Sequence, residues 1–125
     1  MAHDLNSLEQ QMMLAIIKLQ PNAYGVAISD HIERVTGRAY SIGAIYAALD
    51  RLEERGFLAS RQGEPTAARG GRRKLYFDLT APGKSALNQS ISMLDKLRKT
   101  PARSRGRHSH ERGKGDAAKA LARDR

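Results

Sequence analysis

Residues 68–80 read ARGGRRKLYFDLT, and this stretch decides how the rest of the chain is interpreted. Two glycines and four basic side chains come first, and a regular alternation follows in which Leu75, Phe77 and Leu79 share one face. Such alternation is typical of a β-strand with one buried face. A flexible, positively charged segment directly before this strand predicts the tip of a β-hairpin whose base is anchored to a core.

The first strand of this hairpin is expected just upstream. Residues 57–61 read FLASR, a short segment that is apolar at its start, and residues 62–71 contain three glycines and a proline. Glycine and proline clusters of this kind are typical of loops. The sequence therefore predicts two antiparallel strands, at 57–61 and 73–79, joined by a long basic tip.

Three helices are predicted before the hairpin. Asn6 or Ser7 is suited to cap the first, and Pro21 and Asn22 end it. The second is expected from Ala23 or Tyr24 to Gly37, and the third from Ser41, a good N-cap, to Gly56. Apolar residues at helical spacing predict the buried faces: Leu8, Met12, Ile16 and Leu19; Ile28, Ile32 and Val35; Ile42, Ile45, Leu49 and Leu52.

A fourth helix is predicted after the hairpin, with Thr80 as its cap and Pro82 in its first turn. Its apolar side consists of Leu87, Ile91, Leu94 and Leu97. This stripe is longer than a small domain needs for its own core, so we expect it to pair with a second copy of the chain. The alternative is that the stripe packs on the chain's own first helix.

Composition and charge argue against a disulfide-bonded, membrane-spanning or secreted protein. The chain has 125 residues and no cysteine, which excludes disulfides. No apolar run approaches the roughly 20 residues that span a bilayer, and no secretory signal is present, so a cytoplasmic location is expected. Residues 100–125 hold eight Lys or Arg against three Asp or Glu, more than half of the net charge of +9. Few large apolar residues occur there, which predicts a disordered basic tail.

The predicted fold is mainly α-helical with a small β-hairpin, in the order helix, helix, helix, strand, strand, helix. This is the order of a winged helix-turn-helix. We therefore expect a DNA-binding domain over residues 4–80, a dimerisation helix over 81–99 and a basic disordered tail over 100–125.

A winged helix predicts where DNA would bind. The third helix has an outer face that is small and polar in its first turns, which would allow close approach to a duplex, and the hairpin tip supplies positive charge. An ordinary solvent-exposed helix is the alternative. The expected contacts from the third helix are Ser41, Gly43, Ala44, Tyr46, Ala47 and Arg51, and those from the hairpin are Arg69, Arg72, Arg73 and Lys74.

These segments also carry a family resemblance. Residues 24–87 closely resemble the PadR family of bacterial transcriptional regulators, through the pair Tyr24-Gly25, through SIGAIYAALDRLEERG at 41–56, and through GGRRKLYFDLTAPG at 70–83. The resemblance implies a homodimeric repressor that binds a palindromic DNA operator, with the third helix in the major groove. It differs from the usual family pattern at Ala47, where proline is common, and at Ala44, where threonine is common.

The resemblance also implies a small-molecule effector near the dimer interface, as many PadR-like regulators have. The sequence itself shows no site for one, because only 5% of its residues are aromatic and none is tryptophan. Met12, Met13 and Met93 could line an adaptable pocket, although methionine at helical spacing is usually core.

Other functions have weaker support. No nucleophile has a base beside it, His108 and His110 lack further ligands for a metal, and no phosphate-binding loop occurs, so neither an enzyme nor a cofactor is expected. Two alternatives to a sequence-specific regulator are a non-specific nucleic-acid binder that uses the basic tip and tail, and a winged helix that binds proteins. The second predicts an acidic or apolar third helix without a basic hairpin tip, which is the opposite of our interpretation of this sequence.

Overall fold

The computed structural model describes residues 4–64 and 74–103. The predictions made for Arg69, Arg72 and Arg73, and for most of the basic tail, fall outside these residues. The described chain forms α1 (Ser7–Leu19), α2 (Gly25–Thr36), α3 (Ile42–Glu54), β1 (Leu58–Gln62), β2 (Leu75–Leu79) and α4 (Ala81–Lys99), which confirms the predicted order of elements. Met1–Asp95 form one compact unit and Lys96–Arg125 another.

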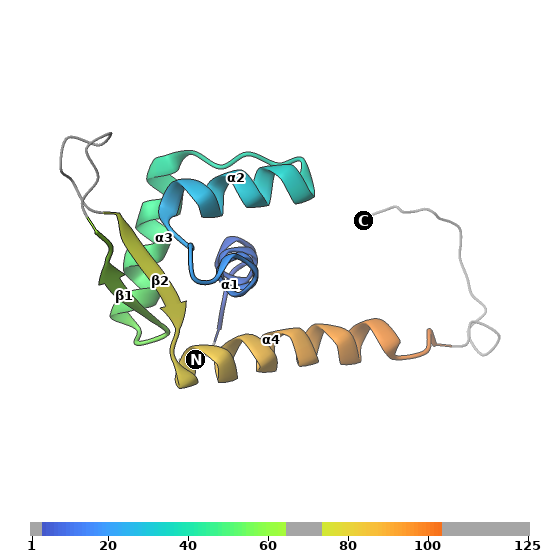
Figure 1. The fold of residues 1–125 in the computed structure, drawn as a ribbon. Helices are drawn as coiled ribbons and strands as arrows, with labels where there is room; N and C mark the ends of the chain where they lie inside the picture. Colours follow the sequence, from blue (N-terminus) through green and yellow to red (C-terminus); the bar gives the residue numbers. More distant parts are fainter. Residues whose placement is uncertain (1–3, 65–73, 104–125) are drawn as a thin grey trace. The chain divides into compact units, whose positions relative to one another are not determined.

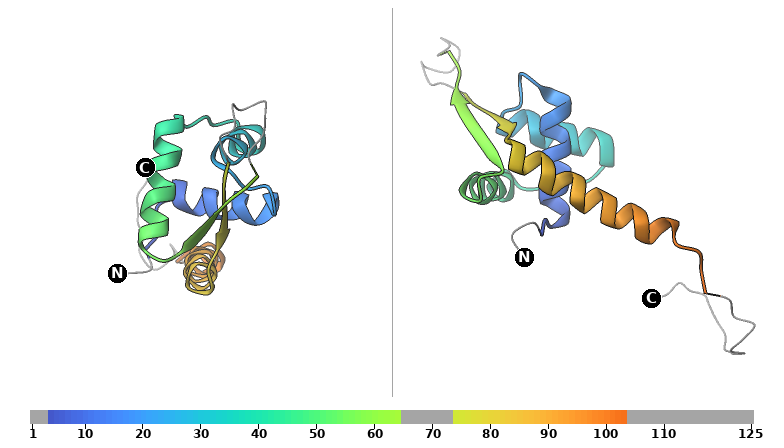
Figure 2. Two further views of the ribbon diagram at one scale, coloured as in Figure 1. Left: turned by 60° about the vertical axis from the view of Figure 1, so that its left-hand side comes forward. Right: turned by 90° about the horizontal axis from the view of Figure 1, so that it is seen from below.

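The first three helices pack together beside the hairpin (Figures 1 and 2). The two strands are antiparallel, with Leu58 opposite Leu79 and Gln62 opposite Leu75. Strand β1 contacts α3, and β2 contacts α1. The core lies where these elements meet. It contains Met12, Met13, Ala15, Ile16, Ala23, Ile28, Ile32, Ile45, Ala48, Leu49, Leu52, Phe57, Leu58, Phe77, Leu79, Ala86 and Leu87.

Local sequence signals explain where the helices begin and end. Asn6 caps α1, because its side chain accepts from the Glu9 N–H while the Glu9 carboxylate accepts from the Asn6 N–H. Gly37 ends α2 in the left-handed conformation, at a φ of 77°, which glycine adopts without strain. Ser41 caps α3 by accepting from the Ala44 N–H at 3.1 Å. These caps are the ones that the sequence predicts.

The start of α4 is fixed to the end of α3. Thr80 caps α4, since its hydroxyl oxygen accepts from the Gly83 N–H at 3.0 Å, and the same hydroxyl donates to the Gly56 carbonyl at 2.6 Å. Gly83 is buried against the backbone of Phe57: an added Cβ would overlap the Phe57 carbonyl oxygen and lie 2.9 Å from its carbonyl carbon. The helix can approach this closely only because residue 83 has no side chain.

Three residues predicted to be buried are exposed instead. Val35, Ile42 and Leu75 are 66%, 46% and 42% exposed. Each lies at one end of its element: Val35 in the last turn of α2, Ile42 in the first turn of α3, and Leu75 at the end of β2 nearest the hairpin tip. Periodicity identifies the face of an element, but it does not show how far along that face the neighbouring elements extend.

Candidate nucleic-acid interface

The N-terminal half of α3 presents a surface of small and uncharged side chains. Ser41, Gly43, Tyr46 and Ala47 are exposed, and Ala44 is half-buried. These are five of the six α3 residues that the sequence predicts to contact DNA, and the structure brings them together on the first two turns of one helix. The Ser41 hydroxyl accepts from the Ala44 N–H, so its own proton remains available for a phosphate oxygen.

Gly43 is the most informative residue of this surface. It lies in the first turn of α3 at an ordinary helical conformation, and apart from its chain neighbours and the backbone of its own helix no atom lies within 4 Å of where its Cβ would be. Glycine in a helix is less favourable than alanine by about 0.5–1 kcal/mol. Neither the backbone nor the packing of the described chain requires glycine here. The position of the missing side chain is therefore open space at the surface of the described fold.

Tyr46 is held in place by the first turn of α2. A Cβ added to Gly25 would lie 2.6–2.7 Å from Cε1, Cζ and the hydroxyl oxygen of Tyr46, so the ring rests directly on the Gly25 backbone. Gly25 is buried, whereas Tyr46 remains 45% exposed. The contact fixes the position of the tyrosine hydroxyl relative to both helices.

Arg51 has a structural partner that the sequence does not reveal. Its Nε donates to Oε2 of Glu9 at 3.3 Å, and Nη1 of Arg55 lies 3.6 Å from Oε1 of the same carboxylate. Glu9 is only 4% exposed, so the two arginines neutralise a buried charge. Arg51 therefore links α3 to α1. Its contact with Glu9 does not support the prediction that it binds DNA.

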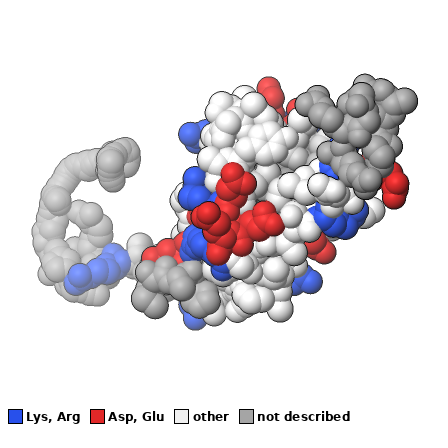
Figure 3. Space-filling model, turned by 90° about the vertical axis from the view of Figure 1, so that its left-hand side faces the viewer, with Lys and Arg blue, Asp and Glu red and all other residues white. Residues whose placement is uncertain are grey.

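The C-terminal half of α3 is acidic on its outer side. Asp50, Glu53 and Glu54 are all exposed there. Figure 3 shows acidic side chains gathered near the middle of the face on which α3 and the hairpin lie, with basic side chains directly beside them. Arg51 and Arg55 are exposed beside them. The N-terminal half of α3 differs in carrying no charged side chain, so it offers a duplex no acidic group that would repel a phosphate.

Aromatic and basic side chains join the tip end of the two strands to the start of α2. The rings of Tyr24 and Tyr76 meet edge to face at 5.7 Å, with the Lys74 ammonium 4.0 Å from the centre of Tyr24 and the Arg61 guanidinium 4.7 Å from that of Tyr76. Such cation–aromatic contacts are favourable. Lys74, predicted to contact DNA, thus lies directly before β2, at the end of the strands nearest the hairpin tip, where it also packs on Tyr24.

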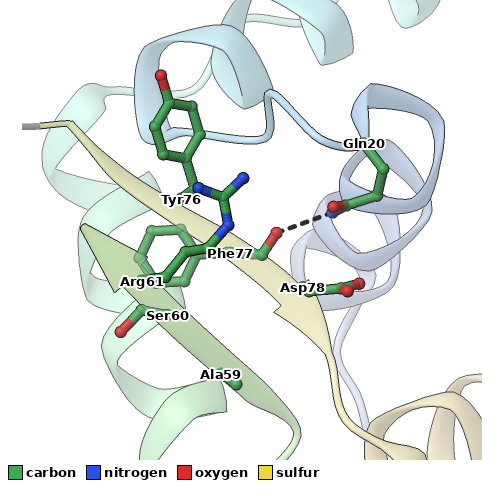
Figure 4. A pocket seen from close by; sticks show the side chains of 7 residues that line it. All are labelled: Gln20, Ala59, Ser60, Arg61, Tyr76, Phe77 and Asp78. Atoms are coloured by element: carbon green, nitrogen blue, oxygen red, sulfur yellow. Dashed lines mark hydrogen bonds between the residues drawn. The ribbon is translucent and has the colours of Figure 1, made fainter. Parts of the chain in front are cut away.

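A small pocket lies on the hairpin near the end of α1 (Figure 4). Its volume is about 150 Å³. Gln20 closes one side of it by donating to the Phe77 carbonyl at 2.8 Å. Ligand pockets usually enclose about 300–1,000 Å³, so this one is too small for a typical effector. Its lining residues are Gln20, Ala59, Ser60, Arg61, Tyr76, Phe77 and Asp78.

Residues 13–89 match the model of the transcriptional regulator PadR-like family, which is well over half of the chain. The chain belongs to the PadR-like family. It is thus a transcriptional regulator with a winged helix-turn-helix, of a DNA-binding rather than an enzymatic family. The described residues contain no helix that is long and apolar enough to cross a membrane.

Solved structures agree with this assignment to the PadR-like family. A PadR-like transcription factor from Bacteroides fragilis is 25% identical, with a TM-score of 0.63 over 74% of this chain and 84% of that one. A transcriptional regulator from Clostridium thermocellum is 24% identical, with a TM-score of 0.62 over 74% and 86%. A PadR family regulator from Clostridium difficile is 23% identical, with a TM-score of 0.56 over 72% and 91%. No curated protein matches the chain significantly.

The structure gives physical reasons for the PadR-like sequence signature. Gly25 of the Tyr24-Gly25 pair makes room for the Tyr46 ring, and Gly83 at the end of the hairpin motif makes room for the Phe57 backbone. Of these two glycines, Gly25 therefore allows α2 and α3 to pack closely, and Gly83 allows the start of α4 to pack on the backbone that precedes β1.

Proposed function

We propose that the protein is a homodimeric repressor that binds a palindromic DNA operator in the cytoplasm. The N-terminal half of α3 would enter the major groove, with Ser41, Gly43, Ala44, Tyr46 and Ala47 at the duplex. The hairpin would contact the sugar-phosphate backbone or the minor groove through its basic residues, which are Arg69, Arg72, Arg73 and Lys74. Membership of a transcriptional regulator family supports DNA as the partner.

The observation that carries the α3 part of this proposal is the open space at Gly43. A helix that only packs on its own core gains stability from alanine at an exposed position of this kind. A helix that inserts into a groove gains from the closer approach that glycine permits. The uncharged residues around Gly43 and the acidic residues from Asp50 onward indicate that the helix would insert by its N-terminal end.

Replacing Gly43 with alanine should change stability and DNA affinity in opposite directions. We expect the free energy of unfolding to rise by about 0.5–1 kcal/mol, because the Cβ meets no atom from another part of the fold and alanine favours the helix. Operator affinity should fall roughly tenfold, because the new methyl group occupies space next to the bases. Denaturant unfolding and a fluorescence anisotropy titration measure the two effects. If the stabilised variant bound the operator with unchanged affinity, the proposal that α3 contacts DNA would be wrong.

A second copy of the chain would pack on α4. In the first unit, Ile91 and Leu94 are 39% and 56% exposed on this helix, and Leu97 of the second unit is 71% exposed. Leu87 differs, since it is 2% exposed and belongs to the chain's own core, so it is not available to a partner. Leu14 and Ile17 of α1 are also exposed, at helical spacing, and would add apolar area to the dimer.

A small-molecule effector would act between two subunits in this proposal. The pocket on the hairpin of the single chain is smaller than ordinary ligand sites, and an interface between α1 and α4 of two copies would create further space. We assign no residue to such a site.

One observation favours a second candidate, a protein-binding winged helix. The exposed acidic residues Asp50, Glu53 and Glu54 on α3 would suit a basic protein surface better than a phosphate backbone. The two candidates differ in what binds to α3: a DNA duplex at its N-terminal half, or a basic protein surface at its acidic C-terminal half. The Gly43→Ala titration distinguishes them, because a protein-binding module shows no specific DNA affinity to lose.

A further inference from the structure

The exposed first turns of α3 lack the side chains that usually recognise three of the four bases. Arginine or lysine binds guanine, asparagine or glutamine binds adenine, and aspartate or glutamate accepts from cytosine. None of these occurs between Ser41 and Ala47. Hydroxyl and apolar groups are the ones that this surface can offer to a base edge. The base with an apolar group in the major groove is thymine, through its 5-methyl.

Ile42 is the largest aliphatic side chain on this surface. Its spacing from Ile45 and Leu49 predicts a core residue, yet it is 46% exposed, whereas Ile45 and Leu49 are fully buried. It directly follows the Ser41 cap and precedes Gly43, whose missing side chain leaves open space beside it. The α3 position nearest the helix N-terminus therefore presents a branched apolar side chain to the outside.

Tyr46 is less suited than Ile42 to contact the methyl group of a thymine. It lies one turn after Ile42 and is similarly exposed, but its ring rests on the Gly25 backbone. This contact restricts the ring, while its hydroxyl can still donate to a phosphate. Ala44 and Ala47 have short side chains that reach a methyl group only at very close approach. Ile42 is thus the residue with both the reach and the chemistry to contact a thymine methyl.

We propose that Ile42 determines specificity by packing against the 5-methyl group of a thymine in each operator half-site. The proposal rests on the proposed function, in which the N-terminal half of α3 enters the major groove. The operator would then contain a thymine whose methyl group, rather than its hydrogen-bonding groups, is recognised. Deoxyuridine differs from thymidine by this methyl alone and pairs with adenine in the same way.

The test uses the full-length protein and a duplex recovered by selection from random DNA. Each thymine of a half-site is replaced in turn by deoxyuridine, and the dissociation constant is measured for the wild type and for Ile42→Ala. For the wild type, one position should weaken binding about fourfold, the effect expected for one buried methyl group. For Ile42→Ala, the same replacement should change affinity by less than twofold, because the partner of the methyl is gone.

Val35→Ala is the matched control, since Val35 is a β-branched residue that is 66% exposed at the far end of α2. It should retain the fourfold sensitivity. A selected motif in which no deoxyuridine replacement weakens binding would overturn this inference and leave the proposed function standing. Equal sensitivity in wild type and Ile42→Ala would overturn it too. Failure to select any motif would instead contradict the proposed function, on which this inference depends.

Discussion

Replacing Gly83 with alanine should destabilise the fold more than any other single methyl group added to the described chain. The new Cβ would overlap the carbonyl oxygen of Phe57, which is backbone and cannot rotate away as a side chain would. The N-terminal turn of α4 would have to move, together with its cap hydrogen bonds from Thr80. Overpacking of this kind usually costs about 1–3 kcal/mol and occasionally more.

Denaturant unfolding measures this effect directly. The matched control is Ser85→Ala, an exposed position in the same helix, where the free energy of unfolding should change by less than about 0.5 kcal/mol. Gly43→Ala is a second control, with the opposite sign. A Gly83→Ala protein as stable as wild type would show that α4 does not begin against the Phe57 backbone.

Replacing Leu94 with glutamate should convert the proposed dimer to monomers and strongly weaken operator binding. Leu94 is 56% exposed in the single chain, so a charge there leaves the winged helix folded, but it would be buried without a partner in the proposed dimer. A monomer can bind only one half-site. Operator affinity should therefore fall roughly a hundredfold or more, because the second contact of a dimer is intramolecular and multiplies the affinity of the first.

Sedimentation and light scattering give the mass in solution, and circular dichroism verifies that the winged helix remains folded. Ser92→Glu is the matched control: it adds the same charge to an exposed position of α4, but two residues from Leu94, on another side of the helix. That variant should stay dimeric and bind the operator normally. A Leu94→Glu protein that remains a dimer would show that α4 is not the dimer interface.

Most of the fold could be predicted because its signals are local. Caps such as Asn6 and Ser41, the terminating Gly37 and the alternation at Phe77 and Leu79 each act within a few residues of one another. The PadR-like family could also be recognised from the sequence motifs, and the matching family model confirms it. Exposure at the ends of elements was not predictable, because it depends on where neighbouring elements stop, as Val35 and Ile42 show.

The candidate site was only partly predictable. Helical spacing identifies the outer face of α3, but the pairing of Arg51 with Glu9 joins residues 42 positions apart and leaves no mark in either local sequence. The contact between Tyr46 and Gly25 is likewise visible only in three dimensions. Ile42 was assigned to the core by its spacing, and its exposure at the helix start makes it a candidate for base recognition.

In the proposed function, two copies of the N-terminal half of α3 recognise a DNA sequence. The most direct measurement is selection of bound duplexes from a random pool by the full-length protein at near-physiological salt. We expect a palindromic motif whose half-sites are separated by about one helical turn of DNA, and loss of that motif for Tyr46→Ala. Recovery of no motif, with binding that disappears as salt rises, would contradict the proposed function and would identify the basic segments as a non-specific nucleic-acid contact.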